Sequence, residues 1–364
     1  MRITCVIHSL SGGGAERVMA GLVSDFSGRG HTVCLVTLDD GLRDRHDLPE
    51  GIHRVCLSRL GNSENLVQAI LSNLKRIASL RRAIRNSRPD VVLSFCDRTN
   101  VLTLLATGLT RLPVVVSERS DPAQQRLGPF WGLLRRIQYR SASRLVALTA
   151  TSADHMRRWH RLPAAIIPSA VTAPLSESTL QSPIAKQSAT SVILGVGRLS
   201  HEKGWDRLIT AFGNIASRHP DWHVWIAGDG DQHDGLQHQI EALGLASRIK
   251  LLGWVRPVAP LYAQADLFVL PSRYEGFPSA LLEAMAAGVA SLAIDCDSGP
   301  REIIRHDVDG WLSTAQDFST DLEKLMRSAC LRNRLADAAP DVLQRFSWEN
   351  MVDQFEALLL QASR

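Results

Sequence analysis

Two cationic side chains and two carboxylates stand where they could bind a phosphorylated ligand. Arg198 and Lys203 lie five residues apart in GRLSHEKGWD (197–206), which follows an expected strand and opens a helix. A guanidinium offers a forked donor and an ammonium a point charge, so the pair suits a diphosphate. Glu275 and Glu283 are separated by seven residues, and Glu283 lies within an apolar run. Because an isolated buried carboxylate is costly, we expect Glu283 to have a protein partner or to face a ligand cavity.

Pro278 predicts how the two acids are positioned. Proline suits the first helical position, so Glu275 is expected in the loop ahead of a helix, with Glu283 about 7.5 Å further along its axis. Three backbone N–H groups would then surround the helix start, those of Gly276, Phe277 and Ser279. This helix end would offer phosphate donors flanked by two hydroxyl acceptors, which is the set of groups that a nucleotide-sugar requires.

Glycines mark two other strand ends. Gly12, Gly13 and Gly14 follow the first expected strand and open a helix, where the backbone can approach a phosphate closely. Neither the G-x-G-x-x-G pattern nor the P-loop pattern fits them. Asp229 and Asp231, in GDGD, could in principle bind a metal. We favour a glycine turn after a strand, with the carboxylates facing solvent or ligand, and expect no metal site.

The elements that carry these motifs follow one plan, seen twice. Residues 3–37 and 191–228 each read as strand, polar loop, helix and strand. Further β-branched runs predict strands at 90–95, 113–118, 144–149, 249–254, 267–272 and 289–295. Strands alternating with helices predict parallel sheets covered on both faces. The fold class is therefore α/β, with two doubly wound Rossmann-like domains whose ligand loops face a central cleft.

The domain boundary is visible in the composition. Residues 172–190 are rich in Ser, Thr, Pro and Ala and lack periodicity, which predicts a linker between an N-terminal domain (1–171) and a C-terminal domain (191–345). The apolar face of 348–361 has no local partner that the sequence identifies. A chain of 364 residues exceeds one ordinary core, which agrees with two domains.

Bulk composition narrows the class of protein. No run of about 18 apolar residues is present, the N-terminus does not read as a signal peptide, and six scattered cysteines indicate reduced thiols in a cytoplasmic protein. Residues 1–168 carry 24 Lys and Arg against 13 Asp and Glu, a balance of +11, whereas the remainder has a balance of −7. The first half is therefore expected to meet an anionic surface. No nucleic-acid-binding module is recognisable.

The motifs at 197–204, 228–230 and 275–283 resemble those of the retaining glycosyltransferases of family four, which have the two-domain GT-B fold. Gly12–Gly14 match that family's first-domain glycine loop. The resemblance implies that Arg198 and Lys203 bind the donor diphosphate, that Glu275 contacts the transferred sugar, and that Glu283 holds the nucleotide ribose. The implied catalytic residues are Arg198, Lys203 and Glu275. The implied donor site comprises Gly13, Gly14, Gly197, Arg198, Lys203, Val255, Glu275, Gly276, Phe277, Pro278 and Glu283.

The same resemblance guides the acceptor side, and there the chain departs from the family. Many members carry a histidine after the fourth strand of the first domain, where this chain has Ser117, Glu118 and Arg119. Glu118 or Arg119 is the candidate for that position, and no histidine role is carried over. The other candidates on this side are His8, Asp97 and Asn100. The resemblance also implies that a closing helix at 346–364 crosses back to the N-terminal, acceptor-binding domain.

The resemblance thus implies a retaining transferase that moves a sugar, from a UDP-hexose or UDP-N-acetylhexosamine, to a hydroxyl of a glycan or of an undecaprenyl-type lipid-linked glycan. Segments such as SERSDP (117–122) resemble bacterial polysaccharide and lipid-linked oligosaccharide transferases. The nucleotide-sugar is a co-substrate, and neither a cofactor nor a metal is expected. The alternatives are a GDP-mannose-dependent mannosyltransferase, a sugar-nucleotide epimerase of the same architecture, and a degenerate scaffold.

Two basic amphipathic stretches, 73–88 and 130–140, suggest an anionic membrane as a further partner. The first combines Leu74, Ile77, Leu80 and Ile84 with arginines, and the second places aromatic and leucine side chains beside arginines. The alternative is that both helices pack their apolar faces on the sheet and leave their charges in solvent. The expected localisation is cytoplasmic, peripheral on the cytoplasmic face of the inner membrane.

Overall fold

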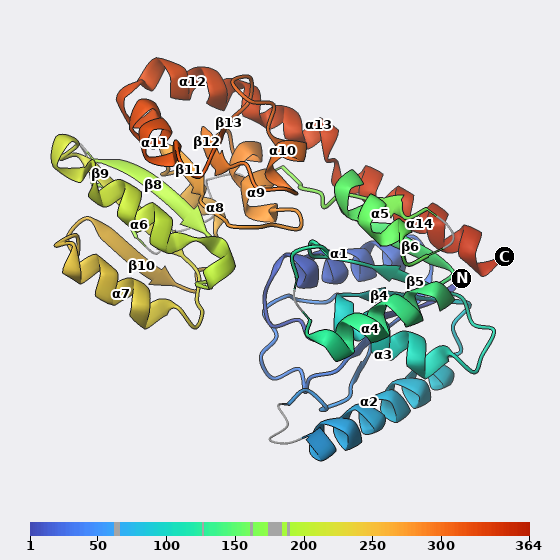
Figure 1. Cartoon of the computed structure of the whole chain (residues 1–364). Helices are drawn as coiled ribbons and strands as arrows, with labels where there is room; N and C mark the ends of the chain where they lie inside the picture. Colours follow the sequence, from blue (N-terminus) through green and yellow to red (C-terminus); the bar gives the residue numbers. More distant parts are fainter. Residues whose placement is uncertain (62–65, 126, 161–162, 174–183, 188–189) are drawn as a thin grey trace. The chain divides into compact units, whose positions relative to one another are not determined.

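Parallel β-sheets form the framework of two units in the computed structural model (Figure 1), which describes residues 1–61, 66–125, 127–160, 163–173, 184–187 and 190–364. The first unit comprises Met1–Ser169 and Trp348–Arg364, and the second comprises Ala170–Ser347. The chain therefore leaves the first unit at Ser169 and returns to it at Trp348. Most of the predicted linker, 174–183 and 188–189, lies outside the described residues.

The first unit contains a seven-stranded sheet in the order β3-β2-β1-β4-β5-β6-β7, and every pairing in it is parallel. Its inner strands are largely β-branched and buried, as parallel strands between helical layers must be, whereas the edge strands β3 and β7 are partly exposed. The strands are β1 (Arg2–Ile7), β2 (Thr32–Thr37), β3 (His53–Cys56), β4 (Val91–Phe95), β5 (Val114–Ser117), β6 (Arg144–Ala147) and β7 (Ala165–Ile166).

Helices cover both faces of this sheet. Two helices of one face, α1 and α14, contact each other, and on the other face α3 contacts both α2 and α4 (Figure 1). The 3-10 turn η1 (Tyr139–Ser141) extends α4. The helices are α1 (Gly14–Gly28), α2 (Leu66–Ser87), α3 (Asp97–Thr107), α4 (Pro129–Gln138), α5 (Ala150–Arg157) and α14 (Trp348–Ser363).

The second unit repeats the arrangement with a six-stranded parallel sheet, β10-β9-β8-β11-β12-β13. Its strands are β8 (Ser191–Val196), β9 (Trp222–Ala227), β10 (Ile249–Gly253), β11 (Leu267–Leu270), β12 (Ser291–Ile294) and β13 (Trp311–Ser313). Its helices are α6 (Trp205–Gly213), α7 (His233–Ala242), α8 (Ala259–Tyr262), α9 (Ser279–Ala286), α10 (Pro300–Ile303), α11 (Phe318–Arg327), α12 (Ala329–Ala338) and α13 (Val342–Arg345), and its 3-10 turns are η3 (His201–Lys203), η4 (Ala216–Arg218) and η5 (Ala339–Asp341).

Both predicted strand–helix–strand repeats are confirmed, as β1-α1-β2 and β8-α6-β9. In each sheet the first strand lies centrally and the order reverses beside it, so the carboxyl ends of β1 and β8 lie at a switch point where ligands bind in such folds. Sequence analysis missed β3, β7 and β13: β7 and β13 have only two and three residues, and β3 (HRVC) is a partly exposed edge strand without an apolar run. All six cysteines are free.

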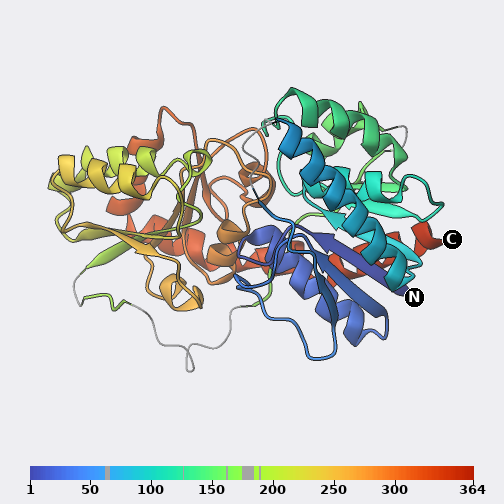
Figure 2. The ribbon, with the colours of Figure 1, turned by 90° about the horizontal axis from the view of Figure 1, so that it is seen from below.

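The apolar face of the closing helix α14 packs on the first unit. Its buried residues are Met351, Val352, Phe355 and Leu359. Phe355 meets Phe95 of β4 with ring centroids 5.9 Å apart. The Trp348 indole N–H donates to Asp25 of α1 at 2.7 Å. Figures 1 and 2 both show α14 in red beside the blue elements of this unit. The apolar residues of α14 cover one face of the sheet, where the helix contacts α1, β4 and β5.

Gly21 of α1 is the residue on which this packing places the tightest limit. A Cβ atom at Gly21 would overlap the Trp348 ring, whereas a Cβ at Gly28, on the same helix, would meet nothing within 4 Å. We therefore expect Gly21→Ala to destabilise the protein by about 2 kcal/mol, since overpacking forces side chains and backbone to shift. Thermal unfolding of both variants checks this: Gly28→Ala should keep the wild-type midpoint, and an unchanged midpoint for Gly21→Ala would contradict the α1–α14 contact.

Candidate active site

The loop after β8 carries the two predicted cations. Arg198 leaves the strand with an exposed side chain, and within the described part of the chain its guanidinium makes no hydrogen bond or salt bridge. Its carbonyl oxygen accepts a 2.9 Å hydrogen bond from the indole N–H of Trp205, a fully buried residue at the start of α6. The loop is thus fixed through its backbone while the guanidinium remains available to a ligand.

Lys203 and Glu275 form an ion pair at the centre of the site. Lys203 Nζ donates to Glu275 Oε1 at 2.6 Å, and Ser272 Oγ donates to the same oxygen at 2.7 Å. Glu275 is 7% exposed, so these donors supply the compensation that a buried carboxylate requires. Neither donor uses Oε2, which leaves that oxygen as the acceptor for a group arriving from outside.

A second ion pair ties the same two loops together. Arg273 donates to both carboxylate oxygens of Asp206, at 2.7 and 2.6 Å, and to the carbonyl oxygen of His201 at 2.8 Å. The hydrogen bonds from Arg273 hold the pKa of Asp206 below its usual range. Sequence analysis missed this clamp, although Asp206 ends the quoted GRLSHEKGWD stretch. Its effect is to fix the Lys203 loop against the Glu275 loop.

The start of α9 differs by one residue from the prediction. The helix begins at Ser279, and Pro278 is its N-cap residue, because its ψ of 96° is extended; the prediction that proline occupies the first helical position is wrong. Within the described residues, the backbone N–H groups around this helix end have no acceptor, those of Gly276, Phe277, Ser279 and Ala280. Free N–H groups at a helix N-terminus are suited to bind an anion.

Glu283 lies in the second turn of α9 and has a protein partner. The hydroxyl of Tyr262, at the end of α8, donates to Glu283 Oε2 at 3.1 Å and to the carbonyl of Ala280 at 3.3 Å. Glu283 is half-buried, so its carboxylate is held in place and partly accessible. Val255, another predicted donor-site residue, is half-buried in the loop after β10.

The glycines of the GDG stretch serve backbone packing. A Cβ at Gly228 would overlap the carbonyl oxygen of Gly197, and one at Gly230 would overlap the carbonyl of Leu199. Asp229 joins the same contact, since its carbonyl accepts a 3.0 Å bond from the N–H of Leu199. The loop after β9 therefore packs against the backbone of the Arg198 loop and holds it in place. Among the described residues, no group of three or more His, Cys, Asp or Glu is placed to hold a metal ion.

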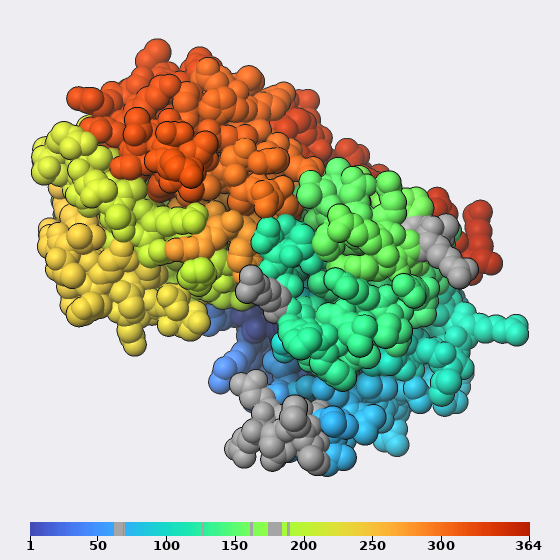
Figure 3. All heavy atoms as spheres, viewed as in Figure 1, coloured from blue at the N-terminus to red at the C-terminus, as the bar shows by residue number. Residues whose placement is uncertain are grey.

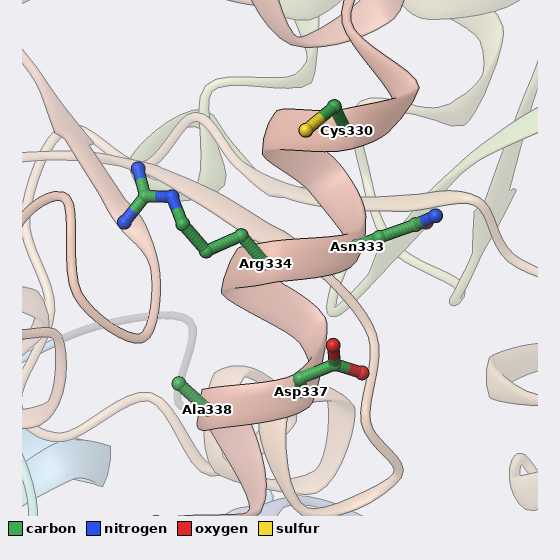
Figure 4. A pocket seen from close by; sticks show the side chains of 5 residues that line it. All are labelled: Cys330, Asn333, Arg334, Asp337 and Ala338. Carbon is green, nitrogen blue, oxygen red and sulfur yellow. The ribbon is translucent and has the colours of Figure 1, made fainter.

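A different hollow lies along one helix of the second unit (Figure 4). Its five lining residues, Cys330, Asn333, Arg334, Asp337 and Ala338, all belong to α12 or its end, and the Arg334 guanidinium is paired with Asp307. Because no second element brings a functional group to this hollow, it has none of the convergence that the β8–α9 loops show.

In the first unit, the glycine loop lies beside an acid that sequence analysis missed. Glu16, in the first turn of α1, is 5% exposed, and its Oε1 lies 3.1 Å from Nε2 of His8, which follows β1. A Cβ at Gly13 would approach the Glu16 carboxylate to 2.5 Å. The sequence does contain a signal for Glu16, because an acid two residues after the glycines lies in the first helical turn, where the helix dipole favours negative charge.

Glu118 and Asn100 belong to one buried network. The Tyr139 hydroxyl donates to Glu118 Oε2 at 2.7 Å, and Asn100 Nδ2 donates to the Tyr139 oxygen at 3.1 Å and to the Ser117 carbonyl at 3.0 Å. Glu118 is 1% and Asn100 0% exposed. Burial raises the pKa of Glu118 to about 7, and nearby Asp97 adds to the increase. Asn100 therefore positions other groups in this structure.

Arg119 points to a different part of the same sheet edge. Its Nη2 donates to Ser169 Oγ at 2.6 Å, and its guanidinium lies 4.9 Å from the centre of the Phe95 ring. Burial lowers the pKa of Arg119 to about 10, and the charge of Glu16 opposes that change. Arg119 is half-buried and Asp97 is 8% exposed. Of the two candidates for the position of the family histidine, Arg119 is the more accessible.

Two family models match the chain. The glycosyl transferase 4-like domain matches residues 13–169, and the domain of glycosyl transferases group 1 matches residues 177–342. The first match covers every strand of the seven-stranded sheet except β1, and the second covers all strands of the six-stranded sheet. The chain belongs to the glycosyltransferases of the GT-B fold, and it is a transferase enzyme.

Relatives match along nearly the whole length. The chain is 25% identical over 366 residues to an undecaprenol-linked glycan alpha-1,4-N-acetyl-D-galactosaminyltransferase of Campylobacter jejuni, with 99% of each chain covered. It is 26% identical to the amylovoran biosynthesis glycosyltransferase AmsD of Erwinia amylovora, covering 96% of this chain and 94% of the relative.

Solved structures show the same fold. Sucrose-phosphate synthase from Thermosynechococcus elongatus superposes with a TM-score of 0.83 at 16% identity, covering 99% of this chain and 98% of that chain. HepE of Anabaena, solved in complex with UDP, superposes with a TM-score of 0.79 at 20% identity, covering 99% and 100%.

Gly299 tests whether the Glu275 loop is held in its present place. Its φ is +97°, and a Cβ there would approach Pro278 Cδ to 2.9 Å and Glu275 Cβ to 3.1 Å. We expect Gly299→Ala to displace the loop and to reduce kcat/KM by tenfold or more, since misplacements of about 1 Å can cost about 100-fold. The control is Gly235→Ala, where a Cβ meets nothing within 4 Å. Steady-state kinetics with equal activity of both variants would contradict the assigned role of the loop.

Proposed function

We propose that this enzyme transfers a sugar, with retention of anomeric configuration, from a UDP-sugar to a hydroxyl of a glycan in bacterial cell-surface polysaccharide biosynthesis. One observation carries the proposal: two cations, two held carboxylates and four backbone N–H groups with no acceptor among the described residues lie in the loop after β8 and around the start of helix α9. A diphosphate flanked by two sets of sugar hydroxyls needs these groups. The UDP complex of HepE supports a uridine nucleotide, and the name of AmsD supports a polysaccharide product.

The chemistry would rest on stabilising a leaving group. As the bond between the anomeric carbon and the diphosphate breaks, negative charge grows on the phosphate oxygens. Arg198, Lys203 and the N–H groups at the α9 start are fixed donors for that charge. The acceptor hydroxyl would attack from the same face and lose its proton to the departing phosphate. No protein nucleophile is then required.

The two acids would orient the donor. Glu275 Oε2 is available to accept from hydroxyls of the transferred sugar, while Oε1 remains bonded to Lys203 and Ser272. Glu283, held by Tyr262, would accept from the ribose hydroxyls. Lys203 contacts Glu275 and, in this proposal, also the diphosphate, so one side chain would couple recognition of the sugar to stabilisation of the leaving group.

The first unit would bind the acceptor. His8, Glu16, Asp97 and Arg119 all lie at the carboxyl ends of β1, β4 and β5, so a glycan hydroxyl could meet several polar groups at this edge. The Campylobacter jejuni relative is named for an undecaprenol-linked acceptor, which favours a lipid-linked glycan here as well. Such an acceptor requires the enzyme to reach the cytoplasmic face of the inner membrane.

The first unit carries exposed apolar and basic groups that suit this task. None of the helices in the described part of the chain combines the length and apolar composition of a membrane-spanning segment. In α2, Leu80 and Ile84 lie in the core and Ile77 packs against it, so most of the predicted amphipathic face serves the fold. Leu74 of that face is 56% exposed, and α4 exposes Phe130 and Leu133. We propose that these side chains enter the membrane interface.

Removing Arg198 should weaken nucleotide binding without unfolding the protein, because its side chain is exposed and unpaired among the described residues. A hydrogen bond to a charged group contributes about 2 kcal/mol, so Arg198→Ala should weaken UDP binding by about 30-fold in calorimetric titration. Lys250→Ala, another exposed cation of the second unit, should bind UDP normally. Wild-type affinity in an Arg198→Ala, Lys203→Ala double variant would refute the site.

Full activity in EDTA would support catalysis without a metal, and rescue by manganese would refute it.

Membrane binding should depend on α2 arginines that have no structural task. Arg81 is excluded from the test, because it donates to the carbonyls of Ala106 and Leu105 at the end of α3. Arg82 and Arg85 are exposed, and their reversal to Glu should reduce sedimentation with anionic vesicles several-fold, most strongly at low salt. The control reverses Lys250 and Arg327 of the second unit, with the same change in net charge. Membrane docking would be overturned if both double variants lost sedimentation equally. It would also be overturned if the Arg82, Arg85 variant sedimented as wild type does.

A further inference from the structure

A second concentration of cations lies in the first unit, outside the candidate active site. Five residues of α4, η1, α5 and the turn after α5 line a cavity of about 390 Å³: Arg136, Arg140, His155, Arg158 and Trp159. It shares no residue with the strand-end loops described above. We call it the Arg136 pocket. Figure 3 shows the surface of α4 and α5 in green.

The three guanidinium groups of the Arg136 pocket form no interaction that stabilises the described part of the fold. Arg136, Arg140 and Arg158 are exposed, and none makes a hydrogen bond or salt bridge to a residue that the structure describes. The neighbouring carboxylate of Asp154 pairs instead with Arg157 at 3.1 Å. Three unpaired cations around one cavity raise the local potential and favour an anionic ligand.

The floor of the pocket is held rigidly. Trp159 is 6% exposed and meets His155 edge to face, with ring centroids 5.1 Å apart. The buried Arg135 guanidinium lies 4.6 Å from the centre of the Trp159 ring. Burial lowers the pKa of His155, and Arg158, Arg135 and Arg136 lower it further against the opposing charge of Asp121. The pocket therefore combines three cations with an indole and with an imidazole whose charged form is disfavoured.

An apolar ridge adjoins the pocket on α4. Phe130 is 61%, Leu133 59% and Ile137 49% exposed. Arg136 and Arg140 follow Leu133 and Ile137 by three residues, so the cationic row lies beside the apolar row on the helix surface. A soluble anion would use only the cations. A ligand with a phosphate and an acyl chain would use both rows.

We propose that the Arg136 pocket binds the phosphate headgroup of a membrane lipid while Phe130, Leu133 and Ile137 contact its acyl region. Guanidinium groups bind phosphate oxygens through paired, charge-assisted hydrogen bonds, which suits a phosphomonoester with exposed oxygens. The site goes beyond the proposed sugar transfer and membrane docking, because it would recognise the phosphate of one lipid headgroup, whereas α2 has no such pocket among the described cavities. It would anchor the first unit in one orientation on the membrane.

The first test uses a lipid in solution, so it does not depend on membrane docking. Dihexanoyl phosphatidic acid, below its micellar concentration, is titrated calorimetrically into the full-length enzyme. The Arg136→Gln, Arg140→Gln, Arg158→Gln variant should bind at least tenfold more weakly, whereas Arg82→Gln, Arg85→Gln should match wild type. Inorganic phosphate should also bind wild type at least tenfold more weakly. Equal affinity for inorganic phosphate would identify a free-anion site and overturn the lipid assignment.

The second test measures preference on membranes. Wild type should bind vesicles containing phosphatidic acid several-fold better than phosphatidylserine vesicles of equal surface charge, and the triple Gln variant should lose that ratio. The Arg82→Gln, Arg85→Gln variant should bind both vesicles less well but keep the ratio. Equal binding to both lipids by wild type, or a preference that survives in the triple variant, would overturn the proposal. UDP binding and sugar transfer to a soluble acceptor are measured in parallel, so failure of the donor site is seen separately.

Discussion

The ion pair between Lys203 and Glu275 is the contact on which the donor site depends. Glu275 is 7% exposed and needs hydrogen-bond donors to offset its burial, and the lysine and Ser272 supply them on one oxygen. This requirement brings the loop after β8 to the loop before α9. The Arg273–Asp206 clamp holds the same two loops at a second point. Arg198 and the N–H groups at the α9 start are positioned as a consequence.

The first unit applies the same physical rule to different residues. Glu16 is buried beside the glycine loop with His8 as its neighbour, and Glu118 is buried beneath Tyr139. In both units, acids lie at the carboxyl ends of central strands, where parallel strands bring loops together. The difference is in the compensating group. Glu275 has a lysine, whereas Glu118 has the hydroxyls of Tyr139 and Ser120, the Arg135 guanidinium at 3.9 Å and a pKa raised to about 7.

Sequence reasoning was most effective where a residue type or spacing is compatible with few structures. Two sheets, two strand–helix–strand repeats and the glycine loops follow from period and punctuation, and the structure confirms the two Rossmann-like domains. The partners of buried acids could not be found in this way. Tyr262 lies 21 residues from Glu283, and Lys203 lies 72 residues from Glu275, so only the fold brings them together. The amphipathic pattern of α2 does not show which of its apolar residues are buried. Leu74 and Leu80 fit the same helical spacing, yet Leu80 is buried and Leu74 is exposed.

The central claim is that a nucleoside diphosphate binds at the start of α9. Hydrogen exchange of backbone amides, measured with and without saturating UDP, tests it most directly, because the N–H groups of Gly276, Phe277, Ser279 and Ala280 have no acceptor among the described residues. We predict that UDP slows exchange in peptides covering 275–280. Unchanged exchange in these peptides under saturating UDP would contradict the account.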